Sequence, residues 1–174
     1  MKSKNVITNY NDLVITKWSA RFNGQTYPCA IGRNGIGQKI GEGDGITPIG
    51  QFRVMGCGFR PDRIKFHSPA MMQRPIRLFD IWSDDPKDPD YNHGLRAFDH
   101  PFSHEKLRRA DGLYDAFAIL DYNFPQAEPG KGSAIFLHIW RKPRHPTEGC
   151  VAFDPLDFAE ILMRWTPQSR VVIK

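Results

Sequence analysis

The most informative part of the sequence is residues 132–153, GSAIFLHIWRKPRHPTEGCVAF. Residues 133–139 (SAIFLHI) are apolar and rich in strand-forming side chains, and the predicted strand carries His138 near its end. A loop rich in proline and basic residues follows, and the chain then returns through TEGC (147–150) into a second short apolar run. This return predicts that His138 lies within hydrogen-bond reach of a cysteine twelve residues downstream.

A cysteine and a histidine in this arrangement predict nucleophilic chemistry. A thiol reacts as its thiolate, so Cys150 needs a base or a positive potential that lowers its pKa below about 8.5. His138 is the candidate base. Gly149 allows a sharp turn in which successive backbone N–H groups point at one spot, as an oxyanion hole requires. Each residue taken alone also has a structural interpretation, because small buried cysteines and structural histidines are common.

Outward from this segment, short strands separated by turns dominate the pattern. The sequence predicts strands over 12–18, 26–32, 51–57, 76–82, 116–122, 133–139 and 170–174. It also predicts two helices. One covers 104–110 with Ser103 as its N-cap, and the other covers 155–165, with Asp154 as N-cap, Pro155 at the first position and an apolar face of Phe158, Ile161, Leu162 and Trp165.

Length and composition favour a single mostly β domain over residues 1–174, with residues 1–11 as an N-terminal extension. No apolar run approaches the roughly 20 residues of a membrane span, and the first fifteen residues contain no signal-peptide pattern. The net charge is +5, which favours an anionic partner, but no basic run or nucleic-acid-binding motif accompanies it. Three cysteines leave at least one thiol free, and Cys29 and Cys57 are expected to be structural.

Two further stretches have compositions that suggest chemistry. Residues 41–52, GEGDGITPIGQF, form a glycine-rich turn, but no Gly-Lys-Ser/Thr follows, which argues against a phosphate-binding loop. Residues 92–115 concentrate histidine and carboxylate side chains, which suits either a polar loop or a zinc site. His93 and Asp99 are six residues apart, where the ligand pair of zinc D-Ala-D-Ala peptidases is seven apart.

The combined motifs resemble the catalytic domain of YkuD-type L,D-transpeptidases. The pattern His138…Thr147-Glu148-Gly149-Cys150-Val151 is similar to the family signature of a His, a spacer and Ser/Thr-His-Gly-Cys. Residues 44–52 are similar to the family's Thr-Pro-x-Gly-x-Phe element, and the resemblance extends over about residues 12–174. The chain differs in having Glu148 where the family has His, Ala152 where it has Arg, and a shorter spacer, as in a divergent TEGCVA subgroup.

The resemblance implies a β-rich sandwich or barrel-like fold and a role in peptidoglycan remodelling, cell-wall biogenesis and cell shape. Cys150 would attack an L-centre carbonyl of a stem peptide and form a thioester, with His138 as general base and acid and the N–H groups of Gly149 and Cys150 holding the oxyanion. The acceptor would be a stem-peptide amine, a D-amino acid or water. The candidate substrate-binding residues are Thr147, Glu148, Arg141, Arg144, Tyr91 and Tyr114.

The resemblance also implies a monomer in the bacterial periplasm or cell envelope, with no cofactor and with sensitivity to carbapenem-type inhibitors. Three alternatives remain open at this stage. One is an L,D-carboxypeptidase or endopeptidase of the same fold. Another is a zinc peptidase that uses His93 and Asp99 with His138 or His145. The last is a non-catalytic wall-binding module.

Overall fold

A computed structural model describes residues 7–65 and 68–174, and its main feature is a sheet of ten short strands. The first five strands in order across the sheet are β6 (Gly50–Phe52), β15 (Val171–Ile173), β1 (Leu13–Ile15), β2 (Ser19–Phe22) and β3 (Gln25–Ala30). The other five are β14 (Val151–Phe153), β13 (Phe136–Ile139), β12 (Ala116–Leu120), β7 (Val54–Phe59) and β8 (Gln73–Pro75). The expected mostly β fold is confirmed.

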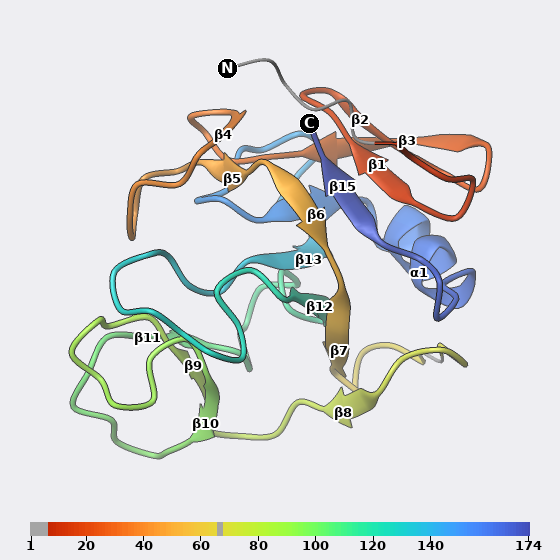
Figure 1. Cartoon of the computed structure of the whole chain (residues 1–174). Helices are drawn as coiled ribbons and strands as arrows, with labels where there is room; N and C mark the ends of the chain where they lie inside the picture. Colours follow the sequence, from red (N-terminus) through yellow and green to blue (C-terminus); the bar gives the residue numbers. More distant parts are fainter. Residues whose placement is uncertain (1–6, 66–67) are drawn as a thin grey trace.

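The large sheet curls round so that distant strands in its order become neighbours in space. β6 and β7 lie eight places apart in the order, yet only Arg53 separates them in the chain. Figure 1 shows them as one bent run through the centre of the molecule. The single strand expected over 51–57 is therefore two strands. Arg53 accepts a backbone hydrogen bond from Asp121 and donates one to its carboxylate, which holds the bend.

Two smaller sheets complete the fold. β9 (Asp80–Ser83) pairs with β10 (Gly94–Arg96) on one side and β11 (His104–Lys106) on the other. β4 (Ile36–Gly37) pairs with β5 (Thr47–Pro48). The helix predicted over 104–110 is wrong, because His104, Glu105 and Lys106 form β11 and pair with β9 instead. Cross-strand pairing outweighed a short helical pattern whose only strong signal was a capping serine.

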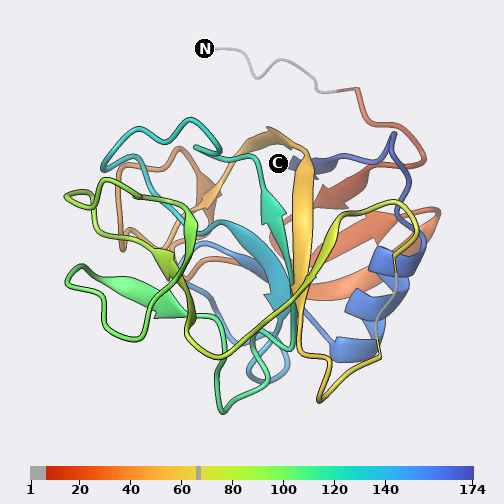
Figure 2. The same cartoon turned by 90° about the horizontal axis from the view of Figure 1, so that it is seen from below.

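The described helix α1 (Pro155–Met163) confirms the second prediction. Asp154 accepts a hydrogen bond from the Leu156 N–H, and Pro155 occupies the first turn. The buried side of α1 joins the main core, which also contains the apolar residues of β1, β13 and β15. Figures 1 and 2 place α1 on one side of the molecule and the β9–β11 sheet on the opposite side.

A second, smaller core lies between the β9–β11 sheet and the strands β12 and β13. It contains Trp82, Tyr114, Phe117 and Phe136, and the rings of Trp82 and Phe136 meet edge to face at 5.0 Å between centroids. Part of the expected N-terminal extension, residues 1–6, lies outside the described residues. Of the described residues, none belongs to a helix long and apolar enough to cross a membrane.

Candidate active site

Two parallel neighbouring strands bring the cysteine and the histidine together. β13 pairs with β14 in the register Leu137 with Val151 and His138 with Ala152. Cys150 precedes β14 and lies beside Phe136, whose N–H donates to its sulfur at 3.4 Å. The sulfur and the imidazole therefore emerge on the same side of the sheet, where both line one cavity.

Cys150 is half-buried as a residue, and its thiol is held by the backbone that leads into β13. Its Sγ donates to the Ala134 carbonyl oxygen at 3.0 Å. Ala134 has a φ of +51°, a left-handed conformation that side chains other than glycine rarely adopt. Burial raises the pKa of the Cys150 thiol to about 12, against the lowering effect of the Phe136 N–H. The resting sulfur is therefore protonated.

His138 is buried and has a fixed ring orientation. Its Nδ1 lies 2.8 Å from the Ile139 carbonyl oxygen, so Nδ1 carries the proton and Nε2 has the free lone pair. The ring of Tyr114 packs edge-on against it at 5.6 Å between centroids. Burial lowers the pKa of His138 to about 4, so the resting imidazole is neutral. This tautomer is the one that a general base facing a thiol requires.

The turn before Cys150 is anchored to two other parts of the chain. Thr147 pairs with Gly32 after β3, and its N–H donates to the Ile31 carbonyl oxygen at 3.0 Å. The Thr147 hydroxyl donates to the Cys150 carbonyl oxygen at 2.6 Å, and Thr47 of the glycine-rich segment contacts that oxygen at 3.4 Å. The segment 41–52 therefore supports the turn that carries the cysteine.

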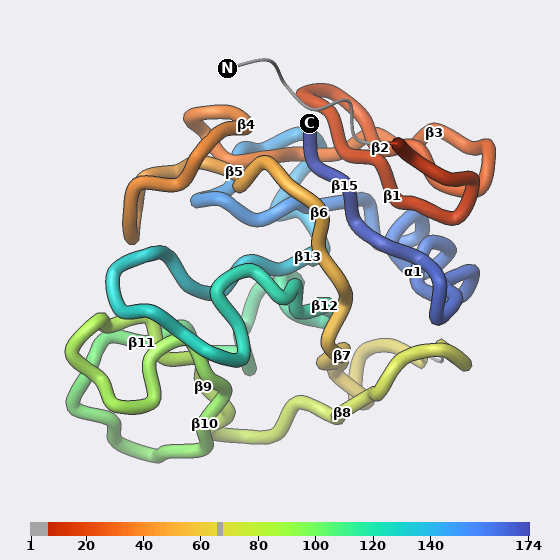
Figure 3. The backbone as a smooth tube through the Cα atoms, viewed as in Figure 1, coloured from red at the N-terminus to blue at the C-terminus, as the bar shows by residue number. Residues whose placement is uncertain are grey.

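The cavity above Cys150 has a volume of about 360 Å³ and is lined by side chains of both charges. Figure 3 shows the loops that surround it gathering on one side of the molecule: the β4–β5 segment, the β12–β13 connection and the β9–β11 region. Its charged or titratable lining residues are Lys39, Glu42, Asp84, Glu105, Arg109, Tyr114, His138, Arg141, His145, Glu148 and Cys150.

Four of the six predicted substrate-binding residues line this cavity, namely Thr147, Glu148, Arg141 and Tyr114. The Glu148 carboxylate forms an ion pair with Arg33.

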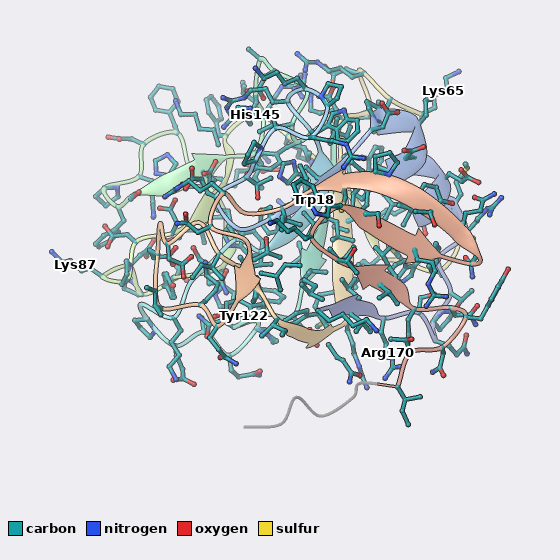
Figure 4. The ribbon with its side chains drawn as sticks, turned by 90° about the horizontal axis from the view of Figure 1, so that it is seen from above. Trp18, Lys65, Lys87, Tyr122, His145 and Arg170 are labelled. Atoms are coloured by element: carbon teal, nitrogen blue, oxygen red, sulfur yellow. The ribbon has the colours of Figure 1, made fainter. Side chains whose placement is uncertain are left out.

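The other two predicted substrate-binding residues have their polar groups engaged elsewhere. Arg144 lies outside the lining, and its Nη1 donates to the Trp18 carbonyl oxygen at 2.9 Å. Figure 4 labels Trp18 and also His145, which lines the cavity. Tyr91 is buried behind the wall, where its hydroxyl bonds the Glu42 carboxylate and accepts the Gly132 N–H at 3.1 Å.

One of the two backbone N–H groups expected to form an oxyanion hole, that of Gly149, makes a hydrogen bond within the turn. The Gly149 N–H donates to the Thr147 hydroxyl at 3.2 Å. Gly149 has a φ of +141°, and a Cβ there would lie 2.9 Å from the Ile46 carbonyl oxygen, so only glycine fits.

Sequence reasoning missed several residues of the cavity because they come from distant loops. Arg109 forms a two-point contact with Asp111 at 2.8 Å for each bond, and its guanidinium lies 5.6 Å from the Tyr114 ring centroid. Glu105 lies 3.6 Å from Arg109, and burial raises the pKa of its carboxyl group. The sequence showed that charged residues are concentrated in 92–115. It did not show that this stretch would line the same cavity as Cys150.

A buried asparagine outside the motifs supports the cysteine's hydrogen-bond acceptor. Asn92 accepts the Ala134 N–H at 2.9 Å and the Trp82 indole N–H at 3.0 Å. Its amide also donates to the Asn123 carbonyl oxygen at 2.5 Å. Asn92 thus holds the strained peptide at Ala134 to which the thiol donates.

The zinc-site alternative has a specific geometric requirement, which is the convergence of His93 and Asp99 with His138 or His145. Across residues 7–65 and 68–174, no three His, Cys, Asp or Glu side chains converge as metal ligands. The structure therefore does not assemble that ligand set from the described residues.

The resemblance stated from the sequence is tested by a comparison against models of protein families. A family model described as the YkuD L,D-transpeptidase catalytic domain matches residues 6–173. The chain belongs to the YkuD family. The match covers nearly all of the sequence and confirms the resemblance, together with the β-rich fold expected from it. Comparisons with curated proteins and with solved structures gave no significant match.

Membership of the YkuD family places the domain among L,D-transpeptidase-type cysteine acyltransferases that act on peptidoglycan stem peptides. Members of the family typically work in the cell envelope.

Proposed function

We propose that this YkuD domain is a periplasmic peptidoglycan L,D-transpeptidase with Cys150 as nucleophile and His138 as general base. The observation that carries the proposal is the pair itself: a thiol and a neutral imidazole with a free Nε2 that line one cavity. In acylation, the Cys150 proton moves to His138 Nε2 as sulfur attacks the L-centre carbonyl carbon. Collapse of the tetrahedral intermediate breaks the amide bond, and His138 protonates the departing amine of the D-residue.

Deacylation uses the same groups in the opposite order. The amine of a second stem peptide, or of a D-amino acid, attacks the thioester carbon and loses a proton to His138. The C–S bond then breaks, and the sulfur recovers its proton from the imidazolium. The N–H groups of Gly149 and Cys150 are the proposed oxyanion donors, which requires the Gly149 N–H to leave the Thr147 hydroxyl as the oxyanion forms.

The charges of the cavity support a zwitterionic peptide substrate. Arg141 and Arg109 supply cationic groups, while Glu42, Asp84 and Glu105 supply carboxylates along the same lining. A stem peptide carries both carboxylate and amino groups, and a guanidinium suits a carboxylate well. We therefore keep Arg141, Tyr114, Thr147 and Glu148 as proposed substrate contacts. Tyr91 acts through Glu42, and the resting contacts of Arg144 point away from the site.

The proposal is tested by intact-protein mass spectrometry after incubation with a carbapenem. The wild-type chain is expected to gain the mass of one opened carbapenem, and Cys150→Ala is expected to gain none. Cys57→Ala is the matched control, because it removes a buried thiol and should leave the adduct unchanged. His138→Ala is expected to slow adduct formation at least a hundredfold while its thermal unfolding stays cooperative.

An adduct that persists in Cys150→Ala would refute the assignment of the nucleophile, and an undiminished rate in His138→Ala would refute that of the base. Muropeptide analysis of digested sacculi then separates transfer from hydrolysis. New cross-linked dimers or exchanged D-residues support transferase activity, whereas shortened stems alone indicate the hydrolase alternative.

A further inference from the structure

Lys39 is a buried cation directly behind the turn that carries Cys150. Its side chain is only 3% exposed, and its Nζ lies 2.6 Å from Asp44 Oδ1 and 3.3 Å from the Ile46 carbonyl oxygen. The residue also lines the catalytic cavity. Burying a lysine costs folding free energy unless its charge is paired. The burial of Lys39 beside Cys150 therefore suggests that it has a role there.

The lysine side chain passes between two glycines that flank the catalytic segment. A Cβ on Gly132 would lie 2.4 Å from the Lys39 Cε, and a Cβ on Gly149 would lie 3.4 Å from its Nζ. Gly132 leads into β13, which carries His138, and Gly149 immediately precedes Cys150. The ammonium group therefore lies next to Gly149, the residue before the nucleophile, and the lysine stem runs through a passage that the missing side chain of Gly132 leaves open.

Asp44 fixes the position of the lysine and of the loop that contains it. Besides the Lys39 ammonium, its carboxylate accepts the N–H groups of Ile40 at 2.8 Å and Ile46 at 2.9 Å. Burial would raise the pKa of Asp44, but the hydrogen bonds from Lys39 and these N–H groups outweigh it and lower the pKa to about 2. The Asp44 carboxylate is thus charged at neutral pH, and the pair belongs to the same segment as Thr47, which contacts the Cys150 carbonyl oxygen.

We propose that Lys39 is a positioning residue for Cys150, whose ammonium group holds the catalytic turn and favours negative charge on the sulfur. The inference rests on the proposed function in taking Cys150 as the nucleophile. Other groups near the thiol have different effects on the charge of its sulfur. Glu105 opposes a negative sulfur from the other wall, the Phe136 N–H favours it, and the neighbouring Tyr114 and His138 are uncharged at rest.

The test is the pH dependence of Cys150 alkylation by iodoacetamide, followed by peptide mass spectrometry so that only this thiol is counted. Lys39→Met is expected to move the profile to higher pH, because a thiol pKa higher by about 1 lowers the thiolate population, and hence the alkylation rate at a fixed pH, roughly tenfold. Glu105→Gln is expected to move it to lower pH. Lys131→Met is the matched control, since Lys131 is exposed and pairs with Glu128 at the surface. It should leave the profile unchanged.

A second pair of variants tests the passage without removing the charge. Gly132→Ala displaces the lysine stem and is expected to slow alkylation at least threefold. Gly130→Ala introduces similar backbone strain, at a φ of +80° against +98°, but meets nothing within 4 Å. Cys150 of Gly130→Ala should therefore be alkylated at the wild-type rate. Tyr122, labelled in Figure 4, lies far enough from Gly132, at 3.5 Å, to accept the new methyl group of Gly132→Ala.

Alkylation needs no peptidoglycan, so its outcome is separate from that of the carbapenem and muropeptide experiments. The proposal is overturned if folded Lys39→Met has the wild-type profile, or if Gly132→Ala and Gly130→Ala react at the same rate. A carbapenem adduct with an unchanged alkylation profile in Lys39→Met would leave the function standing and remove only the role of Lys39.

Discussion

At the scale of single residues, Cys150 and His138 form an uncharged resting pair. The pKa of the thiol is raised to about 12 and that of the imidazole is lowered to about 4, both by burial. In the free protein the proton therefore stays on sulfur. This differs from cysteine enzymes that hold a preformed thiolate and imidazolium ion pair. We expect the free enzyme to react slowly with simple alkylating agents at neutral pH.

The lowered pKa of His138 has a consequence for stability. The unfolded chain binds a proton at this histidine below about pH 6.5, whereas the folded chain does so only near pH 4. His138 therefore favours folding above pH 6.5, and this contribution is lost as the pH falls from 6.5 toward 4, by up to about 3 kcal/mol. Urea unfolding of wild type and His138→Gln across this range measures it. The variant should lose less stability, and equal losses would contradict the assignment.

Prediction from sequence works best for residues that are close in the chain. Cys150, His138 and Gly149 lie within one strand and its return loop, so their spacing alone indicated that Cys150 and His138 would line one cavity. Lys39 and Glu105 reach the same cavity from loops whose arrangement depends on the curl of the whole sheet. No local sequence pattern indicates that the Lys39 side chain will lie between two glycines that are more than ninety residues away in the sequence.

At the scale of elements, the connection between β13 and β14 contains one arginine that lines the cavity and another that bonds a different part of the chain. Arg141, near its start, lines the cavity, while Arg144 adopts a φ of +58° and bonds the Trp18 carbonyl oxygen on the β1–β2 turn. One arginine therefore faces the cavity, and the other joins the loop to the β1–β2 turn. The two residues form a natural pair for comparison.

Replacing Arg141 by Ala is expected to raise KM for a stem-peptide substrate about tenfold with little change in kcat. The physical reason is the loss of a charge-assisted hydrogen bond worth about 1.5–3 kcal/mol. Steady-state assays of D-residue release measure both constants. Arg144→Ala should keep KM within twofold of the wild-type value. A larger effect on KM in Arg144→Ala than in Arg141→Ala would reverse the assignment.

Strands were predicted correctly where all residues of an apolar run pair with the same neighbouring strands. The prediction failed where the two halves of a run pair with different strands. Residues 116–122 and 133–139 contain β12 and β13 as expected. Residues 51–57 alternate as one strand would, yet the bend at Arg53 sends the two halves to opposite ends of the sheet order. Residues 104–106 became a strand because β9 offered a partner, which a local helical pattern does not reveal.

At the scale of the whole molecule, one ion pair ties the first strand to the last. Asp12 is 2% exposed, and its carboxylate accepts two bonds from the Arg170 guanidinium, at 3.0 and 2.7 Å. Arg170, labelled in Figure 4, also donates to Gln51 of β6. The contact spans 158 residues of sequence and fixes the register of β15 between β1 and β6.

Removing this guanidinium is expected to destabilise the domain strongly. Arg170→Ala leaves a buried carboxylate without its partner, at a cost of about 3 kcal/mol in the free energy of unfolding. Arg164→Ala is the matched control, because it breaks a half-exposed pair with Glu160 at the end of α1 that is worth about 0.5 kcal/mol. Urea denaturation of both variants checks the difference. Equal losses would mean that the pair contributes no more than a surface contact.

The interior position of β15 also determines when the fold is completed. β15 is the last strand of the domain to be synthesised, yet it pairs with β1 on one side and β6 on the other. Until β15 has emerged from the ribosome, the sheet lacks an inner strand, and the edges of β1 and β6 are unpaired. The nascent domain therefore stays open while its other strands are made, and the sheet closes only when β15 is inserted between β1 and β6.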